Sequence, residues 1–231
     1  MNKKTIIVTG ASRGIGFETA LHLDRSGHKV IALARSTDRL KKLETSAENG
    51  NIRIFGTDLT SEEEIGKLKA ELREESIDGI INNAGALDKG PFLETSIETF
   101  KHLMDVNVYA IVRLVQQLFE HLNQGAHIVN ISSMSGFQGS LKFPGLSAYS
   151  ASKAAVIGLS ELMSAEFTDY NISVNCLCIG AVQTEMLEEA FPGFDAPVSA
   201  AEMGSYISDF VLKGHNFYNG KVLPVALNDP S

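Results

Sequence analysis

Apolar residues follow two patterns along the chain, and these alternate from one end to the other. Short runs rich in β-branched residues predict buried strands, and the longer segments between them carry apolar residues at helical spacing. The predicted strands are Ile6 to Val8, Val30 to Leu33, Ile52 to Phe55, Gly79 to Ile81, His127 to Ile131, Ser173 to Ile179 and Val222 to Val225. Strands that are apolar on both faces and alternate with helices predict an α/β fold, a single doubly wound parallel sheet with helices on both faces.

Helix starts are predicted where a Ser or Thr is followed three residues later by Glu, the pattern of a capping box. Three such pairs occur: Thr60 with Glu63, Thr95 with Glu98, and Ser199 with Glu202. No Pro/Ser linker, low-complexity stretch or internal repeat divides the chain, so we expect one domain over residues 1–231.

Composition narrows the classes of protein that fit. Hydrophobic residues make up 44% and charged residues 21%, which is typical of a globular protein and not of a disordered chain. The 20 Lys and Arg against 28 Asp and Glu give a net charge of −8, which argues against a nucleic-acid or anionic-membrane surface. The apolar run Thr5 to Val8 is too short for a signal peptide, and no run approaches the roughly 20 residues of a membrane span. We therefore expect a soluble, cytoplasmic protein.

The chain contains two cysteines, Cys176 and Cys178. Their C-x-C spacing lacks the second pair that a zinc site or a disulfide framework needs, so no metal site is expected. On a strand they point to the same face, and we interpret them as small buried core groups.

A glycine-rich turn, TGASRGIG from Thr9 to Gly16, follows the first predicted strand and precedes an amphipathic segment that stops at Gly27. Glycines at 10, 14 and 16 allow a tight turn and close backbone approach, and a helix N-terminus presents free N–H groups to a pyrophosphate. The alternative is a purely structural turn. Its position between a strand and a helix favours a nucleotide site.

With the preceding threonine, the pattern TGxxxGIG resembles the short-chain dehydrogenase/reductase family. Four further matches arrive in the family's order: NNAG at Asn82 to Gly85, Asn107, the pair Ser132 and Ser133, and YSASK at Tyr149 to Lys153. The resemblance covers nearly the whole chain and implies a Rossmann-like domain that binds NAD or NADP. It implies the catalytic residues Asn107, Ser133, Tyr149 and Lys153. It also implies these cofactor-binding residues: Gly10, Ser12, Arg13, Gly14, Ile15, Gly16, Arg35, Asp58, Leu59, Asn83, Ala84, Gly85, Tyr149, Lys153, Gly180, Val182 and Thr184.

The second predicted strand distinguishes between the two cofactors. An NAD site generally has an acid at the end of this strand, but VIALARS has none, and Arg35 stands there with Arg13 in the glycine loop. Guanidinium groups match phosphate geometry, so we predict NADP(H), with NADPH favoured over NADH. The alternative is that both arginines are solvated surface charges. By resemblance, Asp58 and Leu59 lie beside the adenine ring.

Tyr149 and Lys153 share one helix face at i and i+4. We expect the neighbouring ammonium, with an oxidised nicotinamide, to lower the pKa of Tyr149 for general acid/base catalysis. Ser133 would hold the substrate oxygen; it is preferred to Ser132 because the family's serine is followed by two residues and then glycine. By resemblance, Asn107 positions a water that links Lys153 to solvent.

The substrate region is expected to be a compact lid around residues 185–213. Apolar residues there include Met186, Phe191 and Phe194, which either cover a carbonyl substrate or simply pack on the fold. Where relatives have Pro-Gly, this chain has Ile179-Gly180, which loosens the local loop.

The predicted function is interconversion of a carbonyl compound and its alcohol, with 3-oxoacyl thioesters, small ketones or aldehydes, or a pterin-like carbonyl as candidate substrates. A catalytically silent NADP(H)-binding sensor or scaffold is the alternative. An epimerase or dehydratase would need acid/base residues that the sequence does not identify. By resemblance, the chain forms a homodimer or homotetramer.

Overall fold

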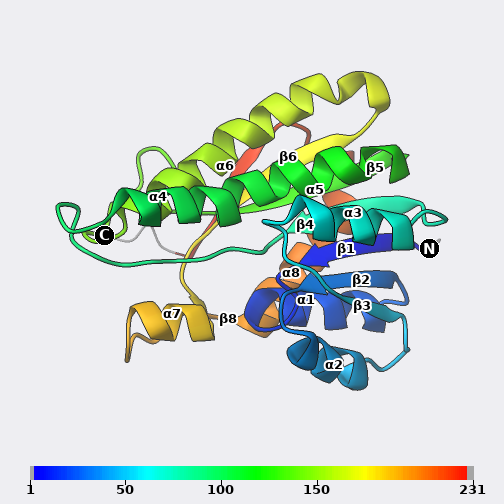
Figure 1. Ribbon diagram of the computed structural model, residues 1–231, viewed down its shortest axis with the longest axis horizontal. Coiled ribbons are helices and arrows are strands. Elements are labelled where there is room, and N and C mark those ends of the chain that lie inside the picture. Colours follow the sequence, from blue (N-terminus) through cyan, green and yellow to red (C-terminus); the bar gives the residue numbers. More distant parts are fainter. Residues whose placement is uncertain (1–2, 228–231) are drawn as a thin grey trace.

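A seven-stranded parallel sheet runs through the part of the chain that the computed structural model describes, residues 3–227 (Figure 1). Its strands are β1 (Thr5–Thr9), β2 (Lys29–Ala34), β3 (Ile52–Gly56), β4 (Ile77–Asn82), β5 (Leu122–Ser133), β6 (Ser173–Ile179) and β9 (Val222–Val225). The order is β3-β2-β1-β4-β5-β6-β9, and every neighbouring pair is parallel. The predicted strands and the doubly wound α/β class are confirmed.

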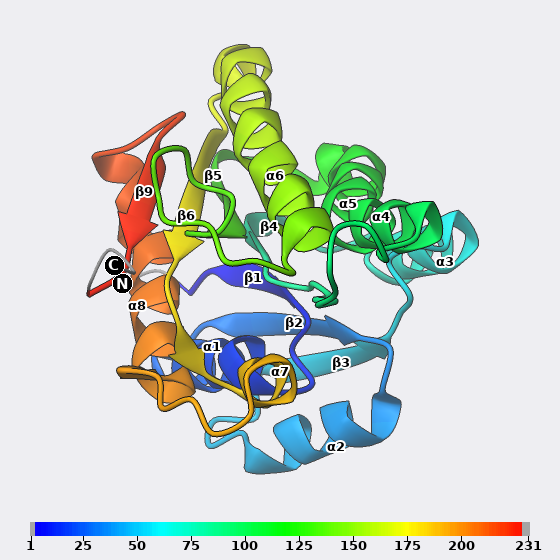
Figure 2. The same cartoon turned by 90° about the vertical axis from the view of Figure 1, so that its left-hand side faces the viewer.

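Helices cover both faces of this sheet (Figures 1 and 2). One layer holds α1 (Gly14–Arg25), α2 (Thr37–Ser46) and α8 (Ala200–Lys213). The other holds α3 (Glu62–Glu71), α4 (Ile97–Met104), α5 (Ala110–Leu118) and α6 (Ser147–Glu166). A π-helical turn, Asp105–Tyr109, joins α4 to α5, and short 3₁₀ turns lie at Phe119–His121, Thr168–Tyr170 and Gly214–Asn216. No helix within residues 3–227 has the length and apolar character needed to cross a membrane.

Two apolar cores lie on opposite faces of the sheet, because successive side chains on a strand point to opposite sides. Ile80 and Ile128 pack toward α3, α5 and α6. Their neighbours Ile81 and Val129 pack toward α1, α2 and α8. The cysteines at 176 and 178 are both fully buried in the first core, as expected for one face of β6.

The start of α3 lies one residue later than predicted. Ser61, not Thr60, is the N-cap, and its Oγ accepts a hydrogen bond from the Glu64 N–H. The Thr60 hydroxyl instead donates to Asp58 Oδ1 at 2.8 Å. Both Thr60 and Ser61 could cap the helix. Because the Thr60 hydroxyl is hydrogen-bonded to the Asp58 carboxylate, Ser61 becomes the cap.

The start of α4 shifts in the same way, from Thr95 to Ser96, because the Thr95 hydroxyl donates to backbone oxygens of the preceding loop. The predicted capping box of α8 is confirmed. Ser199 Oγ accepts from the Glu202 N–H, and the Glu202 carboxylate accepts from the Ser199 N–H at 2.9 Å.

The segment expected to form the lid divides into two parts. Its second part is α8, which packs against α1 and beneath β4 and β5, and so belongs to the body of the fold. The first part holds α7 (Glu185–Ala190) and a two-stranded ribbon of β7 (Val182–Gln183) and β8 (Val198–Ser199) outside the main sheet. A lid role can therefore be proposed only for residues 185–199.

Candidate active site

A cavity of about 400 Å³ opens at the carboxyl ends of the strands, where the strand order reverses between β1 and β4. Most of the predicted site residues line it: Gly10, Ser12, Arg13, Gly14, Ile15, Arg35, Asp58, Leu59, Asn83, Ala84, Gly85, Tyr149, Lys153 and Thr184. The remaining predicted residues lie outside the lining: Gly16, Asn107, Ser133, Gly180 and Val182. Of these, Val182 is buried in the core beside α8, and a side chain on Gly180 would meet Ala226.

The glycine loop brings backbone close to backbone. Gly10 has φ +66°, and a Cβ there would lie 2.9 Å from the Ala84 Cα. A Cβ on Gly16 would lie 2.5 Å from the Asn83 Nδ2, so this glycine allows α1 to pack on the end of β4 and does not line the cavity. Arg13 is the extended N-cap of α1 and its side chain does not cap the helix. The first-turn N–H groups therefore face the cavity, an arrangement that fits a pyrophosphate.

Thr9 and Asn83 lock the ends of β1 and β4 together beside this loop. Thr9 Oγ1 accepts from the N–H groups of Asn83 and Ala84 at 3.0 and 2.9 Å and donates to the Ile81 oxygen. The Asn83 side-chain amide donates to the Thr9 backbone oxygen at 3.0 Å. These hydrogen bonds tie the end of β1 to the residues that follow β4, at the floor of the cavity.

Arg35 directly follows the last residue of β2, at the position expected, and its side chain is exposed at the cavity. Among residues 3–227 it has no ion-pair partner within 4.0 Å. Burial raises the pKa of nearby Asp58, but two hydrogen bonds from Thr60 and the charge of Arg35 outweigh burial, so the net shift is downward. Asp58 is therefore an anion near the cation of Arg35, at the part of the cavity that lies beside the end of β2.

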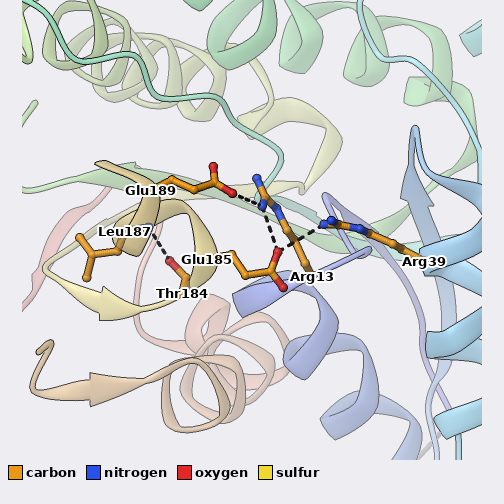
Figure 3. A network of polar contacts seen from close by, with 6 residues as sticks. All are labelled: Arg13, Arg39, Thr184, Glu185, Leu187 and Glu189. Carbon is orange, nitrogen blue, oxygen red and sulfur yellow. Dashed lines mark hydrogen bonds and ion pairs between the residues drawn. The ribbon is translucent and has the colours of Figure 1, made fainter. Parts of the chain in front are cut away.

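Arg13 has partners that the sequence analysis did not identify (Figure 3). Its Nη1 lies 2.9 Å from Glu185 Oε2 and 2.9 Å from Glu189 Oε1, both on α7. Arg39, in the first turn of α2, also reaches Glu185 at 3.3 Å. The i,i+4 spacing of Glu185 and Glu189 was a readable signal that the two carboxylates share a helix face, but the sequence does not show that Arg13 and Arg39 meet them.

Tyr149 and Lys153 lie on one face of α6, with the Lys153 Nζ 5.8 Å from the centroid of the Tyr149 ring. Burial raises the pKa of Tyr149, and a hydrogen bond with the Ser133 side chain opposes it more weakly. Without a cofactor the net shift of the Tyr149 pKa is therefore upward, and the lowering expected with an oxidised nicotinamide beside it stays a prediction. The Lys153 Nζ donates to the Ile131 oxygen at 2.9 Å, and burial lowers its pKa to about 8. The same burial that keeps the phenol neutral weakens the ammonium that was expected to ionise it.

The two serines that end β5 point to different partners. The Ser132 hydroxyl is buried and donates to the Lys153 backbone oxygen at 2.7 Å, which ties β5 to α6. Ser133 is the one that meets Tyr149, and its Oγ accepts from the Ser135 N–H at 3.1 Å. Ser132 borders the cavity but its hydroxyl is committed, so Ser133 is the serine available beside the phenol.

Asn107 lies inside the π-helical turn, which the sequence did not predict. Its Oδ1 accepts from the Ala86 N–H at 2.8 Å, and its Nδ2 donates to the Ala86 oxygen and to Ser152 Oγ. The buried side chain therefore joins the loop after β4 to α6. Gly85 leaves room here, because a Cβ on it would lie 3.2 Å from Asn107 Oδ1 and 3.4 Å from Lys153 Nζ.

Comparison with known proteins identifies this combination of fold and site. A sequence profile described as short chain dehydrogenase matches residues 4–193. The chain belongs to the short-chain dehydrogenase family. It is thereby an oxidoreductase of a family that binds a nicotinamide cofactor and acts on small molecules with CH–OH or C=O groups.

Relatives of this short-chain dehydrogenase cover most of its length. Nodulation protein G of Rhizobium sp. (strain N33) is 35% identical over 189 residues, 79% of this chain and 75% of the relative. An NADPH-dependent 1-acyldihydroxyacetone phosphate reductase of Schizosaccharomyces pombe is 30% identical over 190 residues, 80% of this chain and 62% of the relative. The crystal structure of a dehydrogenase/reductase from Sinorhizobium meliloti 1021 superposes with a TM-score of 0.88 at 26% identity, covering 100% of this chain and 96% of that one.

The loop between Ser133 and Tyr149 in this short-chain dehydrogenase is anchored by a lysine that the sequence analysis overlooked. The Lys142 Nζ donates to the backbone oxygens of Ser135 and Phe137 at 2.8 and 2.6 Å and to Ser140 Oγ. The ammonium thus holds three points of a loop that has no regular secondary structure.

At the outer end of α7, Lys89 reaches across from the loop after β4. Its Nζ donates to the Ala190 oxygen at 3.2 Å and lies 4.0 Å above the ring of Phe191. Phe191 in turn meets Phe143 edge-on, with centroids 6.5 Å apart. Three loops far apart in sequence therefore meet at this outer end of α7.

Proposed function

We propose that the protein is an NADPH-dependent carbonyl reductase that converts a ketone or aldehyde to its alcohol. The observation that carries the proposal is the hydrogen bond between Tyr149, which lines the cavity that begins at the glycine loop together with Lys153, and the Ser133 side chain beside that cavity. Carbonyl reduction needs a proton donor with a hydrogen-bond donor next to it, and a helix end nearby that can hold the phosphates of the cofactor.

When bound, a reduced nicotinamide supplies the hydride that the carbonyl carbon accepts. Ser133 donates a hydrogen bond to the carbonyl oxygen, which stabilises the charge that develops on it. Tyr149 gives its proton to that oxygen as the C–H bond forms and the C=O π bond breaks. Its raised pKa keeps the hydroxyl protonated at neutral pH, which suits the reductive direction. Lys153 and the Asn107 network then return a proton from solvent to the phenolate.

Preference for NADPH over NADH is supported by the end of β2, where Arg35 stands and no carboxylate does. Each charge-assisted hydrogen bond to a 2′-phosphate contributes about 1.5–3 kcal/mol, enough for a tenfold preference or more. The Schizosaccharomyces pombe relative is described as NADPH-dependent, which favours the same assignment.

A turnover screen tests the reaction. Wild type would be incubated with NADPH and a panel of aldehydes, ketones and 3-oxoacyl thioesters, beside Tyr149→Phe and the matched control Tyr170→Phe, an exposed tyrosine. We expect Tyr149→Phe to lose about 10²-fold or more in kcat and the control to keep wild-type turnover. Unchanged turnover in Tyr149→Phe would refute the mechanism. Tight NADPH binding without turnover across the panel would instead favour a sensor or scaffold.

Binding measurements test the cofactor assignment separately. Arg35→Asp should weaken NADPH binding tenfold or more while NADH binding holds or improves. Titration calorimetry of wild type and Arg35→Asp with each of the two cofactors provides the comparison. Equal NADPH affinity in Arg35→Asp and wild type would contradict the NADP preference and would leave the catalytic proposal unaffected.

We further propose that the chain is a homodimer or homotetramer, paired through the helices that carry Asn107 and the Tyr149–Lys153 pair. Exposed apolar residues on these elements, Tyr109 at 48% and Leu162 at 65%, support such a surface. Sedimentation velocity at micromolar concentration should give a dimer or larger species, and a monomer alone would overturn the assembly.

A further inference from the structure

Four charged side chains from three helices meet where the cavity opens beside α7 (Figure 3). Arg13 lies between Glu185 and Glu189, and Arg39 shares Glu185 from the other side. Arg13, Arg39 and Glu185 all line the cavity that Arg35 lines. The arginines that flank the proposed phosphate site are thus already engaged by carboxylates of the chain itself.

The carboxylates in these ion pairs can be replaced by another anion. All four side chains are partly exposed, with between 33% and 67% of each accessible, so each pair is weakly held and screened by salt. A phosphate monoester carries more charge than one carboxylate and accepts two parallel hydrogen bonds from a guanidinium. An incoming phosphate can therefore displace a carboxylate from Arg13 or Arg39.

We propose that Glu185 is a specificity-determining residue: it competes with a 2′-phosphate for Arg13 and Arg39, and so sets how strongly the protein prefers 2′-phosphorylated adenosine cofactors. The inference deepens the proposed NADPH site and rests on it. Glu185 touches both arginines and borders the cavity, whereas Glu189 touches only Arg13, so Glu185 carries the larger effect.

The competition links the cofactor site to α7. The helix is held by the ion pairs of Arg13 and Arg39 with Glu185 and of Arg13 with Glu189, and separately by the bond from Lys89 to the Ala190 oxygen. A phosphate that takes the arginines removes the first of these attachments and leaves the second. The coupling works in both directions: if phosphate binding favours release of α7 from the arginines by a given factor, release of α7 strengthens phosphate binding by the same factor.

Two small probes that differ only in the 2′-phosphate are 2′,5′-ADP and 5′-AMP, with affinities measured by titration calorimetry. Glu185→Gln should bind 2′,5′-ADP about threefold tighter or more than wild type, and 5′-AMP within about twofold. The matched control is Glu188→Gln, which removes the same charge from α7 at a position whose carboxylate, within residues 3–227, accepts a hydrogen bond from the Gly193 N–H and has no ion-pair partner. It should change neither affinity. Unchanged or weaker 2′,5′-ADP binding in Glu185→Gln overturns the proposal.

Hydrogen exchange gives a second readout that does not depend on turnover. Saturating 2′,5′-ADP should speed amide exchange in residues 185–190 of wild type, while 5′-AMP should not. In Glu185→Gln the exchange should already be faster without ligand. Slower exchange in α7 on adding 2′,5′-ADP to wild type overturns the linkage.

These results are separable from the cofactor assignment. Equal affinity of wild type for both probes, with no effect of Arg35→Asp, contradicts the NADP preference. If Glu185→Gln then creates a preference for 2′,5′-ADP, the competition is supported all the same. If wild type prefers 2′,5′-ADP and Glu185→Gln leaves that preference unchanged, the NADP assignment stands and the competition fails.

Discussion

The side-chain amide of Asn83 donates to the backbone oxygen of Thr9 at 3.0 Å and joins two strand ends that are 74 residues apart. The contact closes the point where the strand order reverses, directly beneath the glycine loop. Bringing the two strand ends together costs loop-closure entropy, and the hydrogen bonds made by Thr9 and Asn83 help to offset this cost.

Thr9→Val keeps the shape of the side chain but removes the hydroxyl that serves the N–H groups of Asn83 and Ala84. Buried unpaired donors cost about 1–3 kcal/mol each, so we expect about 2–4 kcal/mol of lost stability. Thr9→Ser keeps the hydroxyl and should lose less than about 1.5 kcal/mol. Urea unfolding of the two variants measures the difference, and equal midpoints would contradict the role given to the hydroxyl.

Glycine to alanine should have opposite effects in two helices. In Gly16→Ala the new Cβ would lie 2.5 Å from the Asn83 Nδ2 and the Gly10 oxygen, so α1 must move away from the glycine loop. We expect a loss of about 2 kcal/mol or more and weaker nucleotide binding. In Gly66→Ala of α3 nothing lies within 4 Å, and the variant should gain about 0.5–1 kcal/mol. Thermal unfolding decides, and a stabilised Gly16→Ala would refute the packing argument.

His127 predicts how stability changes with pH. Its Nδ1 donates to the Val211 oxygen at 3.0 Å, and its Nε2 accepts from the Asn175 amide at 2.9 Å. Burial lowers its pKa to about 4, with the Val211 bond opposing and the charge of His215 adding. The unfolded chain takes up a proton below about pH 6.5 and the folded chain does not until about pH 4, so stability is complete above 6.5 and falls by up to about 3 kcal/mol between these values.

The check is the free energy of unfolding of wild type and His127→Gln between pH 4 and 8. His28 and His215 also have lowered pKa values and account for part of the wild-type slope. We expect the slope to be shallower in His127→Gln. Identical slopes in the two proteins would mean that His127 is not held neutral by the fold.

Substitution of the neighbouring serines should separate catalysis from stability. Ser133→Ala removes the hydroxyl beside Tyr149 and should lower kcat by about 10²–10³-fold with little change in stability. Ser132→Ala removes the buried bond to the Lys153 oxygen and should cost about 1–3 kcal/mol of stability. Turnover and denaturant unfolding are measured on both variants. A reversed pattern would exchange the roles of the two serines.

The strands were predictable from the sequence because neighbouring residues such as Ile80 and Ile81, which point to opposite faces of the sheet, are both apolar. This pattern is typical of a parallel sheet that is buried on both faces. The caps of α3 and α4 were predicted one residue early, because Thr and Ser can both cap a helix, and here the threonine hydroxyls bond to the preceding loops and leave the serines as caps.

The cavity lining was largely predictable because motif glycines and polar residues at strand ends meet at one edge of a parallel sheet. Two features depend on tertiary packing and were not predictable. The partners of Arg13 lie 172 and 176 residues away. The direction of the Tyr149 pKa follows from burial, which a helical repeat does not reveal for a residue beside a cavity.

The π-helical turn from Asp105 to Tyr109 has a consequence for how this chain can vary. Such a turn holds one residue more than the α-helical path, and each residue advances a helix by about 100°. Deleting one residue between Asp105 and Tyr109 would make α4 and α5 one continuous helix. The same deletion would swing either Asn107 or the buried face of α5, which carries Leu114 and Leu118, away from its contacts. The extra residue of the π-helical turn therefore lets Asn107 bond to the loop after β4 while the apolar face of α5 still packs on the core.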